Sequence, residues 1–301
     1  MIPKEFAERM VTMHGERGPE WIRRTEELLA SIKQERNLTY GEPFDLSYHF
    51  VVPASDGNHD YVLKTGFPGQ EFTHEYLALK AFEGPGVVKL MEGKPEEGWM
   101  LLDLVKPGTP LYTIKEEADV LGIWSECACA LWRQLPDDDA DFPTVSDWSR
   151  GLSRLRERYG GGTGPIPEYL LEKAETLFPE LLSTAGPLYL LHGDLHHGNI
   201  LHSDRDGWTV IDPKGLIGER EYDCIQFMLN HWQDHPEPLS LLALRAGTLA
   251  SSLSLSYGRL IRYGLCHAIL SASWCTEDGV GDPSNGIELA KLFDTLIQDE
   301  H

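Results

Sequence analysis

Positive charge, long apolar runs and closely paired cysteines are all scarce in this sequence. Its 301 residues hold 26 Lys and Arg against 48 Asp and Glu, a formal net charge of −22. Reading a nucleic-acid backbone needs concentrated positive charge, so the composition argues against a nucleic-acid partner. No apolar run reaches the roughly 18 residues of a membrane span, and no apolar signal segment follows Met1. We therefore expect a cytoplasmic protein that binds neither nucleic acid nor membrane.

The five cysteines cannot all pair within one chain. Cys127 and Cys129 are separated by a single residue, which is too few for the usual structural zinc pair. Free thiols in a reducing compartment are the simpler explanation. The acidic balance itself has two interpretations that composition leaves open. It is either a charge that keeps the protein soluble or a surface that attracts cationic small molecules.

Hydrophobic periodicity divides the chain into a β-rich N-terminal lobe, residues 1–105, and a mostly helical C-terminal lobe, residues 106–301. The first lobe is expected to contain helices at 20–36 and 71–82 and strands at 48–52, 60–64, 87–91 and 99–104. The second is expected to contain helices at 222–234, 239–255, 257–275 and 285–298 around one strand-rich island at 188–212. This order predicts an α+β fold of two lobes, with an extra helix at the N-terminus.

The most informative motif starts at His192-Gly193-Asp194, continues to Asn199 and ends at Asp212. Phosphoryl transfer from a nucleotide needs this set of groups: one carboxylate to take the proton of the attacking hydroxyl, and an amide oxygen and a second carboxylate to hold magnesium. Protein kinases space the same trio alike, with an arginine where this chain has Gly193. We predict Asp194 as the catalytic base and Asn199 and Asp212 as Mg²⁺ ligands. The alternative is a loop with a turn-forming Asp and a capping Asn.

The N-terminal lobe offers partners for the nucleotide. Lys64 on a predicted strand suits the α- and β-phosphates, and Glu75 on the next helix suits the lysine, with Glu71 as the competing partner. Without the downstream motif, Lys64 reads as a solvated edge residue. No Gly-x-Gly-x-x-Gly precedes it, so phosphate contacts fall to backbone amides or to the Ser47 hydroxyl. Backbone groups between Asp103 and Val105 are expected at the purine edge.

Four histidines crowd the catalytic segment and raise the alternative of a transition-metal site. Neither the helical spacing of a His pair nor paired thiols accompany them. We expect His192 to form structural hydrogen bonds, and the others to lie at or near the surface; these are His196, His197 and His202.

These motifs resemble the aminoglycoside phosphotransferase superfamily. The run Val210–Glu219, with Asp212-Pro213-Lys214-Gly215, is similar to its streptomycin 6-phosphotransferase and hydroxyurea resistance kinase branch. The resemblance implies a two-lobed, protein-kinase-like fold that transfers the γ-phosphate of ATP, or of GTP, to a small-molecule hydroxyl. It also implies that Asp223 braces the catalytic loop. The lobe 1–105 would then bind the nucleotide, and the lobe 106–301 would carry the acceptor site.

The acceptor is expected to be a small hydroxylated and aminated molecule such as an aminoglycoside. Carboxylates suit its amines through charge-assisted hydrogen bonds, and tryptophans suit the walls of its pocket. Each of these side chains also has an ordinary explanation as a solvated acid or a core aromatic. Two rival functions remain: a kinase for another metabolite (a sugar, a choline-like molecule or an amino alcohol), and a catalytically idle nucleotide-binding protein. The candidate acceptor residues are Glu219, Glu221, Trp274, Glu277 and Asp278, with Trp148 as a second aromatic wall.

Overall fold

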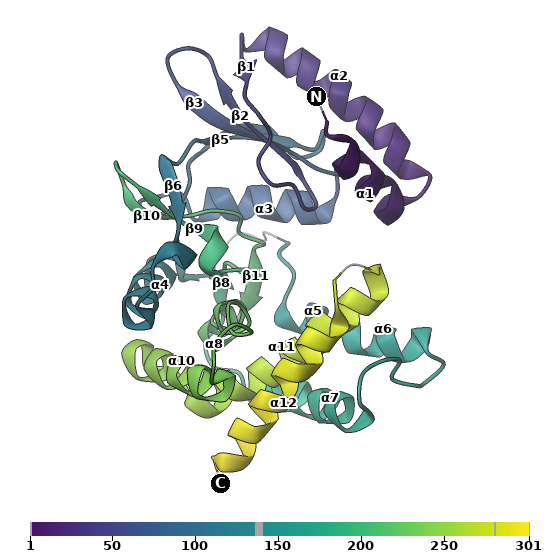
Figure 1. The fold of residues 1–301 in the computed structure, drawn as a ribbon, viewed down its shortest axis with the longest axis vertical. Coiled ribbons are helices and arrows are strands. Elements are labelled where there is room, and N and C mark those ends of the chain that lie inside the picture. The colour runs from purple at the N-terminus through teal and green to yellow at the C-terminus, as the bar shows by residue number, and fades with distance from the viewer. Residues whose placement is uncertain (1, 136–140, 280, 301) are drawn as a thin grey trace. The chain divides into compact units, whose positions relative to one another are not determined.

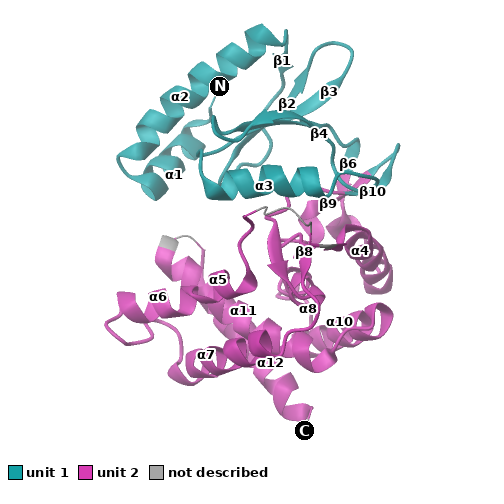
Figure 2. Cartoon of the chain, turned by 180° about the vertical axis from the view of Figure 1, so that it is seen from behind, with its two compact units in different colours: residues 1–108, 203–209 teal, residues 109–202, 210–301 magenta. Residues whose placement is uncertain are grey.

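The protein divides into two compact units in a computed structural model that describes residues 2–135, 141–279 and 281–300 (Figure 2). Unit 1 comprises residues 1–108 and 203–209, and unit 2 comprises residues 109–202 and 210–301. No helix in the described part of the chain is both long and apolar enough to cross a membrane.

Unit 1 is built on a five-stranded antiparallel sheet with the strand order β1-β2-β3-β5-β4. Helices α1 and α2 lie along one face of this sheet and α3 lies on the other (Figure 1). The elements are α1 (Lys4–His14), α2 (Arg17–Glu35), β1 (Thr39–Tyr40), β2 (Phe50–Ser55), β3 (Asp60–Thr65), α3 (Gln70–Ala81), β4 (Leu90–Lys94) and β5 (Trp99–Asp103).

The apolar core of unit 1 fills the space between the sheet and the first two helices. Phe6 of α1 and Leu29 of α2 join a buried cluster with Phe50 of β2 and Leu63 of β3. Side chains of a strand alternate between the two faces of its sheet. Leu63 therefore packs toward α1 and α2, and Lys64 points to the face that α3 covers.

Unit 2 is mainly helical and is organised around α11 (Tyr257–Asp278), which packs against α12 (Pro283–Asp299), α7 (Glu168–Ser183) and α6 (Gly151–Arg158). Helix α11 is buried on most sides, as its central run from Leu260 to Ala272 shows, and such a helix belongs in the middle of a bundle. The remaining helices are α4 (Glu117–Leu131), α5 (Val145–Ser149), α8 (Arg220–Asp223), α9 (Ile225–Met228) and α10 (Pro238–Leu253), with short 3₁₀ turns η1 (Leu111–Thr113) and η2 (His197–Asn199).

Two small sheets complete the fold. One has the order β11-β8-β7, and the other has the order β10-β9-β6. Their strands are β6 (Pro107–Pro110), β7 (Arg133–Gln134), β8 (Tyr189–Leu191), β9 (Ile200–Ser203), β10 (Gly207–Val210) and β11 (Leu216–Gly218).

The structure differs from the sequence prediction in several elements. The helix expected at 222–234 is wrong, because the chain forms two one-turn helices, α8 and α9, and then a bend at His231 with a left-handed φ of 55°. Helix α1 was not expected. The first hairpin turns later than predicted, because β2 continues to Ser55 and the Asp56 carboxylate accepts hydrogen bonds from the next amides, those of Asn58 and His59, both at 2.8 Å.

The lobe boundary expected between residues 105 and 106 stays a prediction. The compact units follow it closely but group residues 203–209 with unit 1. Two contacts account for this: the amide of Asp204 donates to the Lys106 carbonyl at 2.9 Å, and the Arg205 guanidinium donates to the Asp103 carboxylate at 2.5 Å.

Candidate active site

A buried ion pair links β3 to α3 in unit 1. The Lys64 ammonium lies 2.6 Å from a carboxylate oxygen of Glu75, and their side chains are only 3% and 4% exposed. Glu71, the competing partner, is exposed at the start of α3. The structure therefore pairs Lys64 with Glu75. Holding two charges out of water is costly unless they are well paired, so the pair fixes the ammonium in place.

Ser47 lies exposed in the segment that precedes β2. This segment is tied to α1, because the Arg9 guanidinium donates to the carbonyls of Leu46 at 2.5 Å and of Ser47 at 3.4 Å. The hydroxyl is thus available to a ligand, and its predicted role at phosphate stays a prediction.

Asp103 ends β5 and is held by contacts on both its backbone and its side chain. Its amide donates to the Lys89 carbonyl at 2.9 Å. Its buried carboxylate lies 2.9 Å from His59 Nε2 and accepts from Arg205 at 2.5 Å. Burial acts to raise the pKa of this carboxyl, but the hydrogen bonds of Arg205 and His59 outweigh it, and the net pKa is lowered. The Asp103 amide is therefore engaged within unit 1, and the contact of backbone groups at Asp103 and Val105 with a purine edge stays a prediction.

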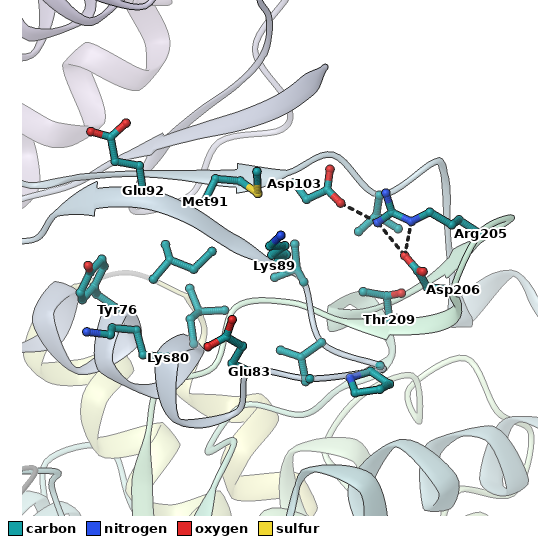
Figure 3. A pocket seen from close by; sticks show the side chains of 18 residues that line it. Tyr76, Lys80, Glu83, Lys89, Met91, Glu92, Asp103, Arg205, Asp206 and Thr209 are labelled. Atoms are coloured by element: carbon teal, nitrogen blue, oxygen red, sulfur yellow. Dashed lines mark hydrogen bonds and ion pairs between the residues drawn. The ribbon is translucent and has the colours of Figure 1, made fainter. Parts of the chain in front are cut away.

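Asp103 and Val105 both line a cavity of unit 1 that is about 690 Å³ in volume (Figure 3). Its other walls come from α3, from the Gly84–Lys89 loop, from β4 and from Arg205, Asp206 and Thr209. In Figure 3 the Arg205 guanidinium bridges Asp103 and Asp206 at the edge of this cavity. Neither Lys64 nor Glu75 is among the described residues that line this cavity, so the cavity is separate from the ion pair.

The catalytic segment of unit 2 is a loop between β8 and β9 that is organised by His192. The backbone amide of Asp194 donates to His192 Nδ1 at 3.1 Å, which makes Nδ1 the acceptor and leaves the proton on Nε2. Nε2 then donates to the Ile211 carbonyl at 2.9 Å. Burial lowers the pKa of His192 to about 3, so the ring is neutral. The expected structural role of His192 is thus seen directly.

Asp194, Asn199 and Asp212 come together on this framework. The Asn199 side-chain nitrogen donates to the Asp194 carbonyl at 2.9 Å, and the Ile211 amide donates to the Asn199 carbonyl at 2.9 Å. Asp212 follows Ile211 with a left-handed φ of 61°, a conformation that is sterically costly for a residue with a Cβ. His196 Nε2 lies 3.9 Å from the Asp194 carboxylate, and Asp212 is close enough to raise the pKa of His196 against the dominant effect of burial.

Asp223 of α8 fixes the start of the same loop. Its carboxylate accepts from the amides of His192 at 3.2 Å and Gly193 at 2.8 Å, and from Trp132 Nε1 at 3.0 Å. Complete burial raises the pKa of Asp223, and these three donors oppose that effect. The brace implied by the resemblance is therefore present.

Two features of the loop were not foreseen. His197 was expected near the surface, and this is wrong: it is 3% exposed and stacks on Phe227 of α9 with a centroid distance of 4.4 Å. Trp124 of α4 donates from Nε1 to the Leu195 carbonyl at 2.9 Å. A tryptophan on the apolar face of a helix is typical of a core residue, and that pattern carries no information about the hydrogen bond.

The carboxylates predicted for the acceptor are mostly engaged inside unit 2. Glu219 is buried and accepts from the Gly186 amide at 2.8 Å, from the Tyr263 hydroxyl at 2.8 Å and from Arg259. The Glu221 carboxylate accepts from the Ser256 amide at 3.2 Å, and Glu277 accepts from Arg154 at 3.1 Å. These contacts make Glu219 a structural residue, and its acceptor role stays a prediction without support here.

Trp274, by contrast, belongs to an aromatic cluster with Trp148 of α5. The two indoles meet edge to face, with centroids 5.5 Å apart. The side chain of Asp278, the last residue of α11, lies outside the described part of the chain.

A family model and several known proteins are similar to this chain. A family model described as aminoglycoside/hydroxyurea antibiotic resistance kinase matches residues 50–279. The chain is 25% identical to streptomycin 6-kinase of Streptomyces glaucescens, over 92% of each chain. It is 26% identical to hydroxyurea phosphotransferase of Kitasatospora aureofaciens, over 97% of this chain and 85% of that one.

Solved structures share the fold at low identity. One is a thermostable mutant of aminoglycoside phosphotransferase APH(4)-Ia in complex with ADP and hygromycin B (TM-score 0.65, 14% identity, 89% of this chain and 97% of that one). Another is choline kinase LicA from Streptococcus pneumoniae (TM-score 0.64, 13% identity, 91% of this chain and 99% of that one). The predicted α+β, protein-kinase-like fold is thereby confirmed.

Proposed function

Since the chain belongs to the aminoglycoside/hydroxyurea antibiotic resistance kinase family, we propose that it moves the γ-phosphate of ATP or GTP, with Mg²⁺, to a hydroxyl of a small aminated acceptor. Family membership makes it a phosphotransferase that acts on a hydroxyl group. The nucleotide, the metal and the acceptor are the parts that this proposal adds.

One observation supports the proposal more than any other: hydrogen bonds join Asn199 to Asp194 and to Ile211, the residue that precedes Asp212. The Asn199 amide nitrogen is used in the bond to the Asp194 carbonyl. Its oxygen is therefore the atom left to act as a ligand, beside the Asp212 carboxylate. Amide and carboxylate oxygens are hard donors of the kind that Mg²⁺ prefers, so the residues fit this ion. The ion supplies charge neutralisation at the phosphates when it is bound.

The protein residues have separate tasks in this reaction. In unit 1, the Lys64 ammonium binds phosphate oxygens, and Glu75 fixes its direction. In unit 2, the Asp194 carboxylate accepts a hydrogen bond from the acceptor hydroxyl and orients its oxygen toward the γ-phosphorus. It takes the hydroxyl proton as the new P–O bond forms and the bond from the γ-phosphorus to the bridging oxygen breaks, which releases the nucleoside diphosphate. Asp223 and His192 hold the backbone of that loop, so the carboxylate needs little reorganisation.

An acceptor panel tests the proposal. ADP release from Mg-ATP and from Mg-GTP would be measured with streptomycin, hygromycin B, choline, glucose and hydroxyurea. The expected result is acceptor-dependent release that is highest with an aminated acceptor. Turnover with choline or glucose in its place would assign the enzyme to another metabolite. Slow release that no acceptor increases would identify an idle nucleotide-binding protein and refute the proposal.

Streptomycin is the first acceptor to try. The relatives named streptomycin 6-kinase from two Streptomyces species span 92% or more of each chain, and a streptomycin 3″-kinase of Klebsiella pneumoniae spans 81% of this one. The formal charge of −22 also draws a cationic acceptor toward the protein.

A further inference from the structure

Trp148 occupies the space beside the loop residue that precedes the proposed base. A Cβ placed on Gly193 would lie 3.4 Å from Cη2 of the Trp148 indole, and 3.3 Å and 3.2 Å from the Cβ atoms of Lys214 and Leu216. The motif in protein kinases has an arginine at this point. Here glycine has no Cβ, so the indole of Trp148 lies beside the residue that precedes Asp194.

The indole of Trp148 is fixed by the helix that carries it and by the aromatic side chains on which it packs. Helix α5 starts with a capping box in which the Thr144 hydroxyl accepts from the Asp147 amide at 3.1 Å and the Asp147 carboxylate accepts from the Thr144 amide at 2.9 Å. Trp148 then packs on Trp274 at 5.5 Å, on Tyr222 at 6.2 Å and on His267 at 6.3 Å between ring centroids. An aromatic ring fixed in this way loses little entropy when a ligand binds to it.

The described aromatic side chains that pack on Trp148 carry no negative charge. Tyr222 and His267 are buried, and the tyrosine oxygen lies 2.7 Å from His267 Nδ1. Burial lowers the pKa of His267 to about 4, which keeps this ring neutral. The nearest carboxylate in sequence, Asp147, is engaged by Thr144 and lies 3.2 Å from Arg150. The ring contacts of Trp148 are therefore with uncharged side chains.

Trp148 and Trp274 are the members of this cluster that remain partly exposed, as does the Asp194 side chain at 27%. We infer that the indole of Trp148 contacts the acceptor and sets its specificity, by receiving a positively charged, ring-shaped part of the molecule while the hydroxyl points to Asp194. This inference rests on the proposed function and adds the residue that recognises the acceptor. It also explains how a site whose candidate acids Glu219 and Glu277 are engaged elsewhere can select an aminated molecule.

Two substitutions of Trp148 test the inference, using whichever panel acceptor gives the highest turnover. Trp148→Leu removes the aromatic face, and Trp148→Phe keeps a smaller one. We expect Trp148→Leu to raise the acceptor KM by about 5- to 30-fold, with most of the loss in KM, and Trp148→Phe to raise it by less than about 3-fold. The Kd for Mg-ATP is measured in the same variants, because the nucleotide is a different ligand from the acceptor. Tyr169→Leu, at an aromatic that is 53% exposed on α7 of the same unit, is the matched control.

A neutral form of the same acceptor gives an independent measurement. Acetylating its amines should raise the KM of the unaltered enzyme about as much as Trp148→Leu does, and should add little to the effect in that variant. This comparison also decides the matter if Trp148→Leu does not fold, because Trp148→Phe then replaces it.

Two results would overturn the inference while the proposed function stands: an acceptor KM that Trp148→Leu leaves unchanged, or equal losses in kcat and in Mg-ATP binding. Highest turnover with an uncharged acceptor, or absence of acceptor-dependent ADP release in the unaltered enzyme, would overturn both. The two failures are therefore distinguishable.

Discussion

Replacing Glu75 by alanine leaves the Lys64 ammonium buried without the carboxylate that lies 2.6 Å from it. Both side chains are almost fully removed from water, at 3% and 4% exposure. Removing one partner of such a pair costs about 3–5 kcal/mol of folding free energy, because the remaining charge stays desolvated. An exposed pair of the same length offers a comparison. Arg23 and Glu27 on α2 are also 2.6 Å apart but are 61% and 64% exposed, so Glu27→Ala should cost less than about 1 kcal/mol.

The assay is urea unfolding, with hydrogen exchange at the amides of β3 and α3 to follow unit 1 itself. The double variant Lys64→Met with Glu75→Ala removes both charges, so it should lose less than Glu75→Ala alone, and the cycle yields their coupling energy. Glu75→Ala should also raise the KM for ATP, since the ammonium is no longer fixed. If Glu75→Ala cost no more than Glu27→Ala, the reasoning from burial would be refuted.

Three further outcomes are expected. Asp194→Asn should lower kcat by about 10²–10⁴ and leave Mg-ATP binding nearly unchanged; full activity in an acceptor-dependent ADP assay would disprove its role as base. Gly193→Ala should destabilise the fold by about 1–2 kcal/mol, measured by chemical denaturation, because φ is 80° and the Cβ would meet Trp148 and Leu216. Burial lowers the pKa of His267 from 6.5 to about 4, so as the pH falls this side chain protonates first in the unfolded chain. The free energy of unfolding should therefore fall by about 1.4 kcal/mol per pH unit between pH 6.5 and about pH 4. His267→Gln should show a shallower loss of stability over that pH range, and equal slopes in the two proteins would contradict the assignment.

The catalytic and metal-binding residues could be proposed from the sequence because they are separated by only a few residues along the chain. Asp194, Asn199 and Asp212 lie within one segment, and a strand before and after it brings the ends of that segment together. Lys64 and Glu75 were predictable for the same reason, since strand alternation and the next helix place both on one face of the sheet. The family assignment followed from residues 210–219, and the family comparison confirms it.

The remaining features depend on contacts between distant segments. His197 was expected at or near the surface, but it is covered by Phe227 of α9, a helix that lies much later in the chain. Glu219 was predicted at the acceptor, with a solvated acid as the alternative, but it is buried and accepts hydrogen bonds from Arg259 and Tyr263 of α11. Periodicity within one segment reports which face of that segment is apolar. It does not report which segment will cover a polar side chain.

The grouping of residues 203–209 with unit 1 has a consequence for biosynthesis. Unit 1 includes residues 203–209, which are synthesised about one hundred residues after β5. Asp103 can therefore form its hydrogen bond with Arg205 only after most of the chain has been synthesised. Domains that are contiguous in sequence can finish folding while translation continues. This one reaches its full set of contacts only late in translation, and a fragment that stops at residue 108 would carry a buried acid without its arginine.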